Sequence, residues 1–269
     1  MRLACCFALA ASVLFGACAW GAGYASDENF IVLAAERQTA DMVLAAAAEF
    51  ADEAARKWLG KTEFVAERRT WITVELTVDE DQGLFWPIDD PRRKLHKLWI
   101  ATSPERAVGS TLRHEMTHVV FATQLSTRLP AWANEGAASR CDEHDRAARR
   151  NEIMRACVDQ RRWPSLESLF ATPRISIDDE TSYATAASVT EHLIARSDER
   201  SFIEFALAGE RLGWDAALMQ YYNIPSLDVL QTQWQAWTAQ RVRRPVVAPT
   251  MGRPVNVFGS ATPLRATGS

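Results

Sequence analysis

The chain has 269 residues, of which 48% are hydrophobic, and its formal net charge is −4. This length and hydrophobic content are enough for one or two folded domains with a substantial core, and they exclude a fully disordered chain. The 30 Lys and Arg residues are spread along the chain, so the charge pattern provides no nucleic-acid footprint, and we expect no nucleic-acid partner.

Residues 1–26 are predicted to be a secretory signal peptide. A positive residue near the start is followed by an apolar run from Leu3 to Phe15 and then by small residues. This run is shorter than the roughly 20 residues that a membrane span requires. We therefore expect a secreted or periplasmic protein, cleaved after Ala19 or a little later. The alternative is a lipoprotein anchored at Cys18, because the sequence FGAC resembles a bacterial lipoprotein box.

Two of the five cysteines, Cys141 and Cys157, remain once such a signal is removed. An even pair in an oxidising compartment predicts a disulfide bridge between them. The alternative is a pair of buried thiols.

The first part of the folded region reads as a mixture of strands and one long helix. Asn29–Leu33 is a short apolar run that predicts a strand, and Gln38–Leu59 is rich in Ala, Glu and Leu, which predicts a helix. Trp71–Val78 alternates and is rich in β-branched residues, and Leu95–Ala101 is a second such run. We expect these two segments to pair in one sheet.

The second part reads as helical. Ser103–Glu105 has the cap, first-turn proline and acidic residue of a helix start, and Pro130 is a suitable first residue for the next helix. Helical patterns dominate Thr181–Trp237, with breaks near a serine, a glycine and a proline. Residues 241–269 contain many Pro and Gly without an apolar period, which predicts a disordered tail. Residues 27–240 are therefore the predicted domain.

The sequence His114-Glu115-Met116-Thr117-His118 places two histidines one helical turn apart. Both imidazole rings can then reach the same ion from one face of the helix, with Glu115 at the edge of that face. The apolar residues of the segment fall on the opposite side, towards a core. The alternative is a helix whose histidines only make structural hydrogen bonds.

A catalytic zinc ion needs a third protein ligand if a fourth position is to stay open for water. The segment LPAWANEG supplies Glu135 soon after the two histidines. The rival third ligands are Asp142, Glu143 and His144. Alternatively, these three residues belong to a solvated, charged surface helix that continues through Arg149 and Arg150.

HEMTH followed by LPAWANEGAA resembles the gluzincins, particularly small peptidase-MA-like domains, in which the glutamate of W-x-x-E-G is the third ligand. The resemblance implies an α+β, zincin-like fold with a small mixed β-sheet, an active-site helix and a helical C-terminal subdomain. It also implies one Zn²⁺ per chain, bound by His114, His118 and Glu135, and Glu115 as the general base.

Further residues enter through the same resemblance. Leu95–Ala101 corresponds to the edge strand that holds an extended substrate, so His96 and Trp99 are expected to border the cleft. SYATAAS resembles a segment whose tyrosine, here Tyr183, donates to the oxyanion; its alternative role is a core tyrosine. His192 is expected to be structural, and the aromatic pair in the last helix, Trp234 and Trp237, is expected in the core.

We therefore expect a secreted zinc metallopeptidase that hydrolyses bonds in a peptide or protein substrate by metal-activated water. One alternative is a zinc amidase that acts on a non-protein amide, such as a cell-wall linkage. Another is a non-catalytic zincin-like protein that binds a partner through its cleft. The intact histidines and Glu115 argue against loss of catalysis.

Overall fold

The computed structural model describes residues 23–78, 81–88 and 95–243. Most of the predicted signal peptide, with Ala19 and Cys18, lies outside these residues, and so does the predicted tail from residue 244 onwards. Residues 23–26 form strand β1, and a signal cut after Ala19 would retain that strand. The last helix continues to Arg243, so the first residues of the predicted tail are helical.

Within the described residues, five strands form one mixed sheet in the order β1-β2-β3-β5-β4. The strands are β1 (Gly23–Ser26), β2 (Phe30–Ala34), β3 (Arg69–Leu76), β4 (Gln82–Trp86) and β5 (Leu95–Thr102). The central strands β2, β3 and β5 are parallel, and the outer strands β1 and β4 are antiparallel to their neighbours. The predicted α+β class and the predicted pairing of β3 with β5 are confirmed.

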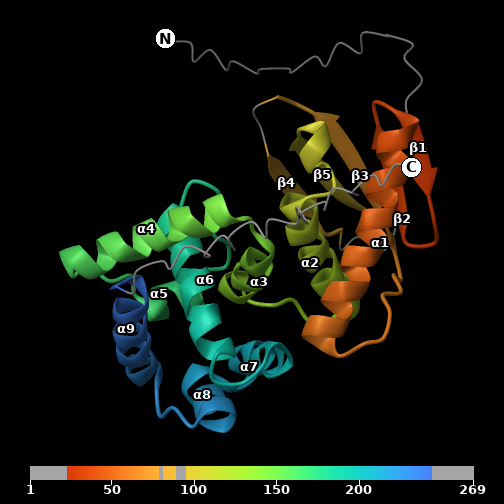
Figure 1. Ribbon diagram of the computed structural model, residues 1–269. Coiled ribbons are helices and arrows are strands. Elements are labelled where there is room, and N and C mark those ends of the chain that lie inside the picture. The colour runs from red at the N-terminus through yellow and green to blue at the C-terminus, as the bar shows by residue number, and fades with distance from the viewer. Residues whose placement is uncertain (1–22, 79–80, 89–94, 244–269) are drawn as a thin grey trace, which may run out of the picture.

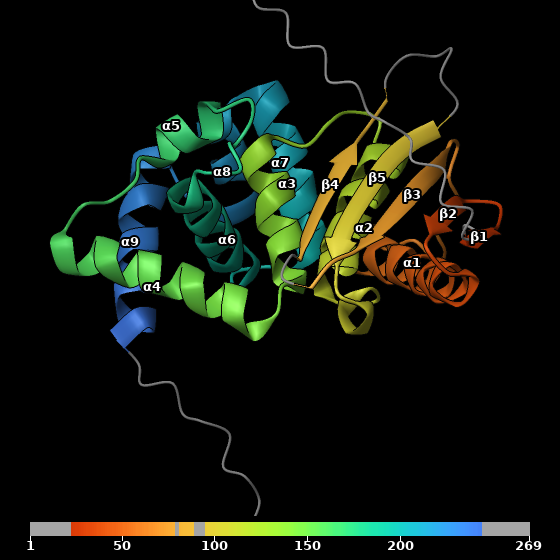
Figure 2. The same ribbon diagram turned by 90° about the horizontal axis from the view of Figure 1, so that it is seen from above.

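Helices α1 (Arg37–Leu59) and α2 (Ser110–Gln124) lie side by side against one face of this sheet (Figures 1 and 2). α1 contacts β1 and β2, and α2 contacts β4 and β5. Alternating strand residues such as Ile72 and Leu98 are fully buried beneath them, as period-2 patterning requires. α1 ends at Gly60, whose φ of 65° is left-handed and costs a glycine little. The predicted helix in this region is confirmed.

The start of α2 differs from the prediction. Ser103–Glu105 does not open the long helix: Pro104–Arg106 forms a single 3₁₀ turn, η1, and α2 begins only at Ser110. The backbone N–H of Gly109 donates to the Arg106 carbonyl at 2.7 Å, which closes the turn. A Cβ atom on Gly109 would lie 2.8 Å from that oxygen, so the tight turn depends on glycine.

The remaining helices gather on one side of the sheet, beyond β4 (Figures 1 and 2). They are α3 (Ala131–Ala138), η2 (Ser139–Cys141), α4 (His144–Gln160), α5 (Leu166–Ala171), α6 (Glu180–Ile194), α7 (Glu199–Leu212), α8 (Trp214–Tyr222) and α9 (Leu227–Arg243). The predicted breaks near Ser197, Gly213 and Pro225 coincide with the junctions of α6 to α9. No helix in the described part of the chain is long and apolar enough to cross a membrane.

The sequence analysis predicted the wrong segment as the edge strand beside the site. Leu95–Ala101 lies within β5, which is an interior strand between β3 and β4. The outer strand beside the helices is β4, with the sequence QGLFW. The glycine in this segment is typical of a turn between strands, but Gly83 pairs with Ile100 in the antiparallel ladder of β4 and β5.

The predicted disulfide is also wrong, because Cys141 and Cys157 are free thiols, each partly exposed. Cys141 ends η2, whereas Cys157 lies 13 residues beyond the start of α4 at His144. At a rise of about 1.5 Å per residue, that stretch of helix is about 20 Å long. A bridge requires Cα atoms roughly 4.4–6.8 Å apart, so the straight helix α4 holds the two thiols out of reach.

Candidate metal centre

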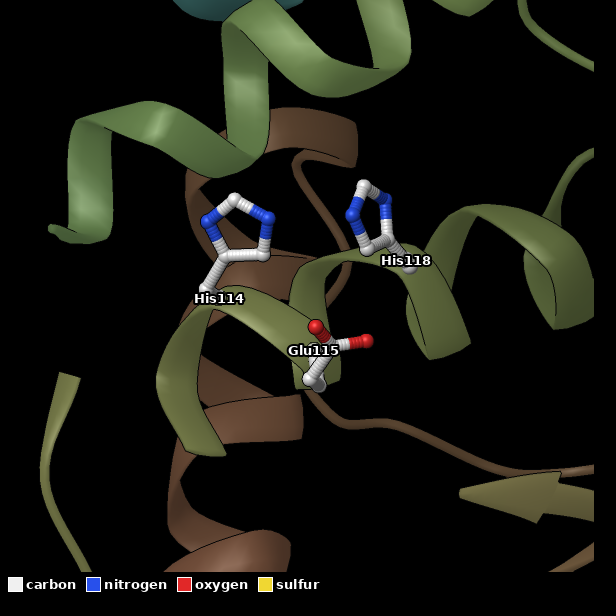
Figure 3. A group of neighbouring side chains, drawn as sticks. All are labelled: His114, Glu115 and His118. Carbon is white, nitrogen blue, oxygen red and sulfur yellow. The ribbon is translucent and has the colours of Figure 1, made fainter. Parts of the chain in front are cut away.

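One turn of α2 brings three polar side chains together. Ligand atoms of His114, Glu115 and His118 all lie within 4.8 Å of one another. Figure 3 shows the two imidazole rings side by side on the same side of α2, with the Glu115 carboxylate below and between them. Met116, on the opposite side of the helix, is fully buried. The helix thus has the polar face and the core face that its sequence predicts.

Glu135 approaches these histidines from the next helix, α3. Its Oε2 lies 3.8 Å from Nε2 of His114 and 3.7 Å from Nε2 of His118. Its side chain is 21% exposed, about twice the exposure of His118. The structure therefore brings together the three residues predicted as ligands, with the Glu135 carboxylate facing Nε2 of both histidines.

The far nitrogen of each imidazole ring is bound by a polar side chain. His114 Nδ1 lies 3.1 Å from Asp142 Oδ1, and His118 Nδ1 lies 3.0 Å from Asn134 Oδ1. Because a carboxylate or an amide oxygen can only accept, each Nδ1 carries the proton and donates it. The Nε2 atoms are then directed towards the common point, as metal-ligating histidines require.

Asp142 is neither a surface residue nor a direct member of the cluster. Its side chain is only 3% exposed, and its second oxygen accepts from Arg150. The interpretation of this region as a fully solvated charged helix is therefore wrong for Asp142. Glu143 and His144 are exposed, so that interpretation holds for these two residues.

The tryptophan and the glycine of the segment W-x-x-E-G each have a structural role. Trp132 is fully buried and stacks on Phe170 with 3.9 Å between ring centroids, which anchors α3 in the helical core. A Cβ atom on Gly136 would lie 2.1 Å from Thr190 Oγ1, so α3 and α6 meet there at close range. This contact brings α6, which carries Tyr183, towards Glu135.

Tyr183 lies near the acidic side of the site. Burial raises the pKa of its phenol, and the negative charges of Glu135 and Glu115 raise it further, whereas Arg174 lowers it. The phenol is half-buried and packs against the core edge of the helical part. The raised pKa keeps the phenol neutral and able to donate a hydrogen bond.

The electrostatics of the cluster favour a positive charge at its centre. Burial disfavours the charged form of His114, but hydrogen bonds to Asp142 and Glu135, together with the charges of Asp142 and Glu115, outweigh burial and raise its pKa well above its ordinary value. Burial also raises the pKa of Glu115, although His118 and His114 oppose this effect. A field that retains a proton on a buried imidazole also favours a cation between the rings.

The residues present fit a metal ion with tetrahedral geometry. Two neutral imidazoles and one carboxylate are a known set of ligands for catalytic zinc, and ligand atoms around tetrahedral Zn²⁺ lie about 3.4 Å apart. The two distances from Glu135 Oε2, at 3.7 and 3.8 Å, are within half an ångström of that spacing. Small side-chain movements would therefore complete the coordination.

The other residues singled out in the sequence lie elsewhere. His96 is buried and its Nδ1 accepts from the Ile88 backbone N–H, while the Trp99 indole donates to Glu75 on the sheet. His192 is buried against Trp237, and Trp234 is fully buried, as the core interpretation predicts. These contacts assign them to the sheet and the helical core.

The sequence analysis missed three contacts to the site. Asn134 pairs with His118, Asp142 pairs with His114, and the backbone of Gly83 lies against Glu115. The position of Asn134 directly before Glu135 was the only local indication of a role. A comparison of the chain with protein-family models found no match, and neither did a comparison with curated protein sequences.

Proposed function

We propose that this protein is a zinc-dependent hydrolase of the gluzincin kind that cleaves peptide bonds. The observation that carries the proposal is the position of Glu135. One of its carboxylate oxygens, Oε2, lies within 3.8 Å of Nε2 of both His114 and His118. Because Nδ1 of each histidine is engaged by another side chain, Nε2 is the ring atom that faces Glu135 and that a metal ion would bind.

The donor set supports zinc as the ion. Two imidazole nitrogens and one carboxylate oxygen leave a fourth tetrahedral position, and borderline-soft nitrogen ligands favour zinc over calcium or magnesium. The second bonds of the imidazoles, to Asp142 and Asn134, are the type that stabilises metal-ligating histidines. Zinc at this site would polarise a substrate carbonyl and lower the pKa of a water molecule.

Two side chains around the proposed ligands are assigned roles in hydrolysis. Glu115 lies beside the two histidines, where its carboxylate can accept the proton of the attacking water and deliver it to the leaving amine. The Tyr183 phenol, kept protonated by burial and by the nearby carboxylates, can donate to the carbonyl oxygen as negative charge develops there. The zincin-like fold and an exported location belong to the same proposal.

The test separates hydrolysis from metal binding. Wild-type protein loaded with Zn²⁺ is assayed on a mixed peptide library and on peptidoglycan, alongside Glu115→Gln and the matched control Glu143→Gln. We expect about one zinc per chain in all three proteins by elemental analysis, and cleavage of peptides by wild type and control. Glu115→Gln should lose about 100- to 10,000-fold in rate, the usual effect of removing a general base.

Other outcomes would change the assignment. Cleavage of peptidoglycan but not of peptides would replace the peptidase with an amidase that uses the same site. Equal rates for wild type and Glu115→Gln would contradict the proposed base. Zinc binding without any hydrolysis would favour a non-catalytic binding protein.

A further inference from the structure

Arg146, near the start of α4, touches two groups that are far apart in the sequence. Its Nη1 lies 3.7 Å from Asp142 Oδ1, the oxygen that accepts from His114. Its Nη2 lies 3.4 Å from Asp81 Oδ2 and also donates to the backbone carbonyl of Asp81. One guanidinium thus connects the residue that orients a proposed metal ligand to the residue that directly precedes strand β4.

Asp81 ties the beginning of β4 to its surroundings. Its Oδ1 accepts from Thr102 Oγ1 at 3.0 Å, at the end of β5, and from Thr111 Oγ1 at 2.7 Å, in the first turn of α2. Arg146 donates to the same Thr111 hydroxyl at 3.1 Å. The Asp81 side chain is 15% exposed and the Arg146 side chain 37%, so this network is only partly shielded from solvent.

Strand β4 in turn borders the proposed base. Gly83, two residues after Asp81, lies against the Glu115 side chain. The network therefore has two ends at the site. One end runs through Asp142 to His114, and the other runs through Asp81 and β4 to Glu115.

The geometry points to Arg146 as a positioning residue that fixes strand β4 and the metal-binding face of α2 relative to α4. This inference deepens the proposed function and rests on it. Without Arg146, Asp142 still pairs with Arg150, and Asp81 still lies 3.9 Å from Arg106, so neither carboxylate is left unpaired and the protein is expected to fold. The loss should therefore appear at the metal and in the chemical step.

The matched control is Arg149, on the same helix. It is 61% exposed and pairs with Glu152 and Glu180, outside the network. The experiment compares Arg146→Met with Arg149→Met in the full chain, loaded with Co²⁺ as a spectroscopic probe. The measurements are the Co²⁺ dissociation constant, the visible absorption spectrum of bound Co²⁺, kcat and KM on a peptide that wild type cleaves, and the melting temperature without metal.

We expect Arg146→Met to weaken Co²⁺ binding about 10-fold, as loss of outer-shell support commonly does, and to alter the Co²⁺ spectrum. Its kcat should fall at least about 10-fold with little change in KM, because the reacting groups are misplaced while the substrate-binding surface remains. Arg146→Lys should recover part of both effects, and Arg149→Met should match wild type. A purely structural role would lower the melting temperature without changing the spectrum, and that result would overturn the inference.

Asp81→Asn provides an independent arm if Arg146→Met fails to fold. It should reproduce the spectral change, and combining it with Arg146→Lys should add little, because both changes act on one network. Simple addition of the two effects would overturn the coupling. If wild type binds Co²⁺ but cleaves nothing, the proposed function fails, whereas the affinities and spectra still decide the role of Arg146.

Discussion

The backbone of Gly83 in strand β4 lies directly against the Glu115 side chain on α2. A Cβ atom added to Gly83 would lie 2.5 Å from Cγ and 2.6 Å from Oε1 of Glu115. Real Cβ atoms do not approach other atoms so closely, so any larger residue at position 83 would require the Glu115 side chain to move. The outer strand of the sheet and the proposed base are therefore in contact at Gly83.

Gly83→Ala is expected to displace the Glu115 carboxylate without disturbing the histidines. Because the added methyl group must push Glu115 aside, kcat should fall by about 10- to 100-fold, the effect of misplacing a reacting group by about an ångström. Zinc content should stay at one per chain. The control is Gln82→Ala, at an exposed neighbour in the same strand, and equal kcat values for the two variants would show that Glu115 tolerates the methyl group.

Glu135→Ala is expected to lose zinc, because it removes the carboxylate that faces both Nε2 atoms. Two histidines alone leave the tetrahedral set incomplete. Glu143→Ala removes an exposed carboxylate a few residues later and should retain wild-type affinity. Zinc affinity is measured by competition with a chromogenic chelator. Full affinity in Glu135→Ala would mean that the ligand set is different, with Glu115 as the nearest replacement.

Tyr183→Phe is expected to slow hydrolysis about 100-fold, the usual effect of removing one donor to an oxyanion. Zinc content and melting temperature should change little, because the ring and its packing against the core remain. Tyr24→Phe, at an exposed tyrosine of strand β1, serves as the control. The decisive quantity is kcat at saturating substrate. A value equal to that of wild type would assign Tyr183 to packing alone.

His192 is expected to make the protein less stable in mild acid. Burial and the nearby Arg196 lower its pKa to about 4, and its ring nitrogens have no hydrogen-bond partner among the described residues. In the unfolded chain, histidine has a pKa of about 6.5, so between these values the unfolded state binds more protons. The stabilisation is complete above pH 6.5 and is lost as the pH falls towards 4.

The measurement is the urea midpoint at pH 7 and at pH 5 for wild type, His192→Phe and the exposed control His144→Gln. His192→Phe keeps the contact with Trp237 and leaves no polar group unpaired, so it should remain stable at pH 7. It should lose less stability than wild type at pH 5. Parallel losses in all three proteins would mean that other groups cause the acid sensitivity.

The local features of this protein follow from its sequence alone. Residues four apart on a helix lie on one side of it, so the spacing of His114 and His118 is sufficient to place both rings together. The apolar periods of α1, β3 and β5 likewise predict their type, because each period matches one regular backbone geometry. These properties depend only on neighbours within a few residues.

The relationships between elements were decided by the tertiary structure. Glu135 reaches the histidines because burial of Trp132 and the close approach at Gly136 set the position of α3. The sequence does not encode in any short pattern that β4 is the outer strand, that Asp142 turns inwards, or that α4 separates the two thiols. Such contacts depend on how helices and strands pack to exclude water from a shared core, and packing is a property of the whole chain.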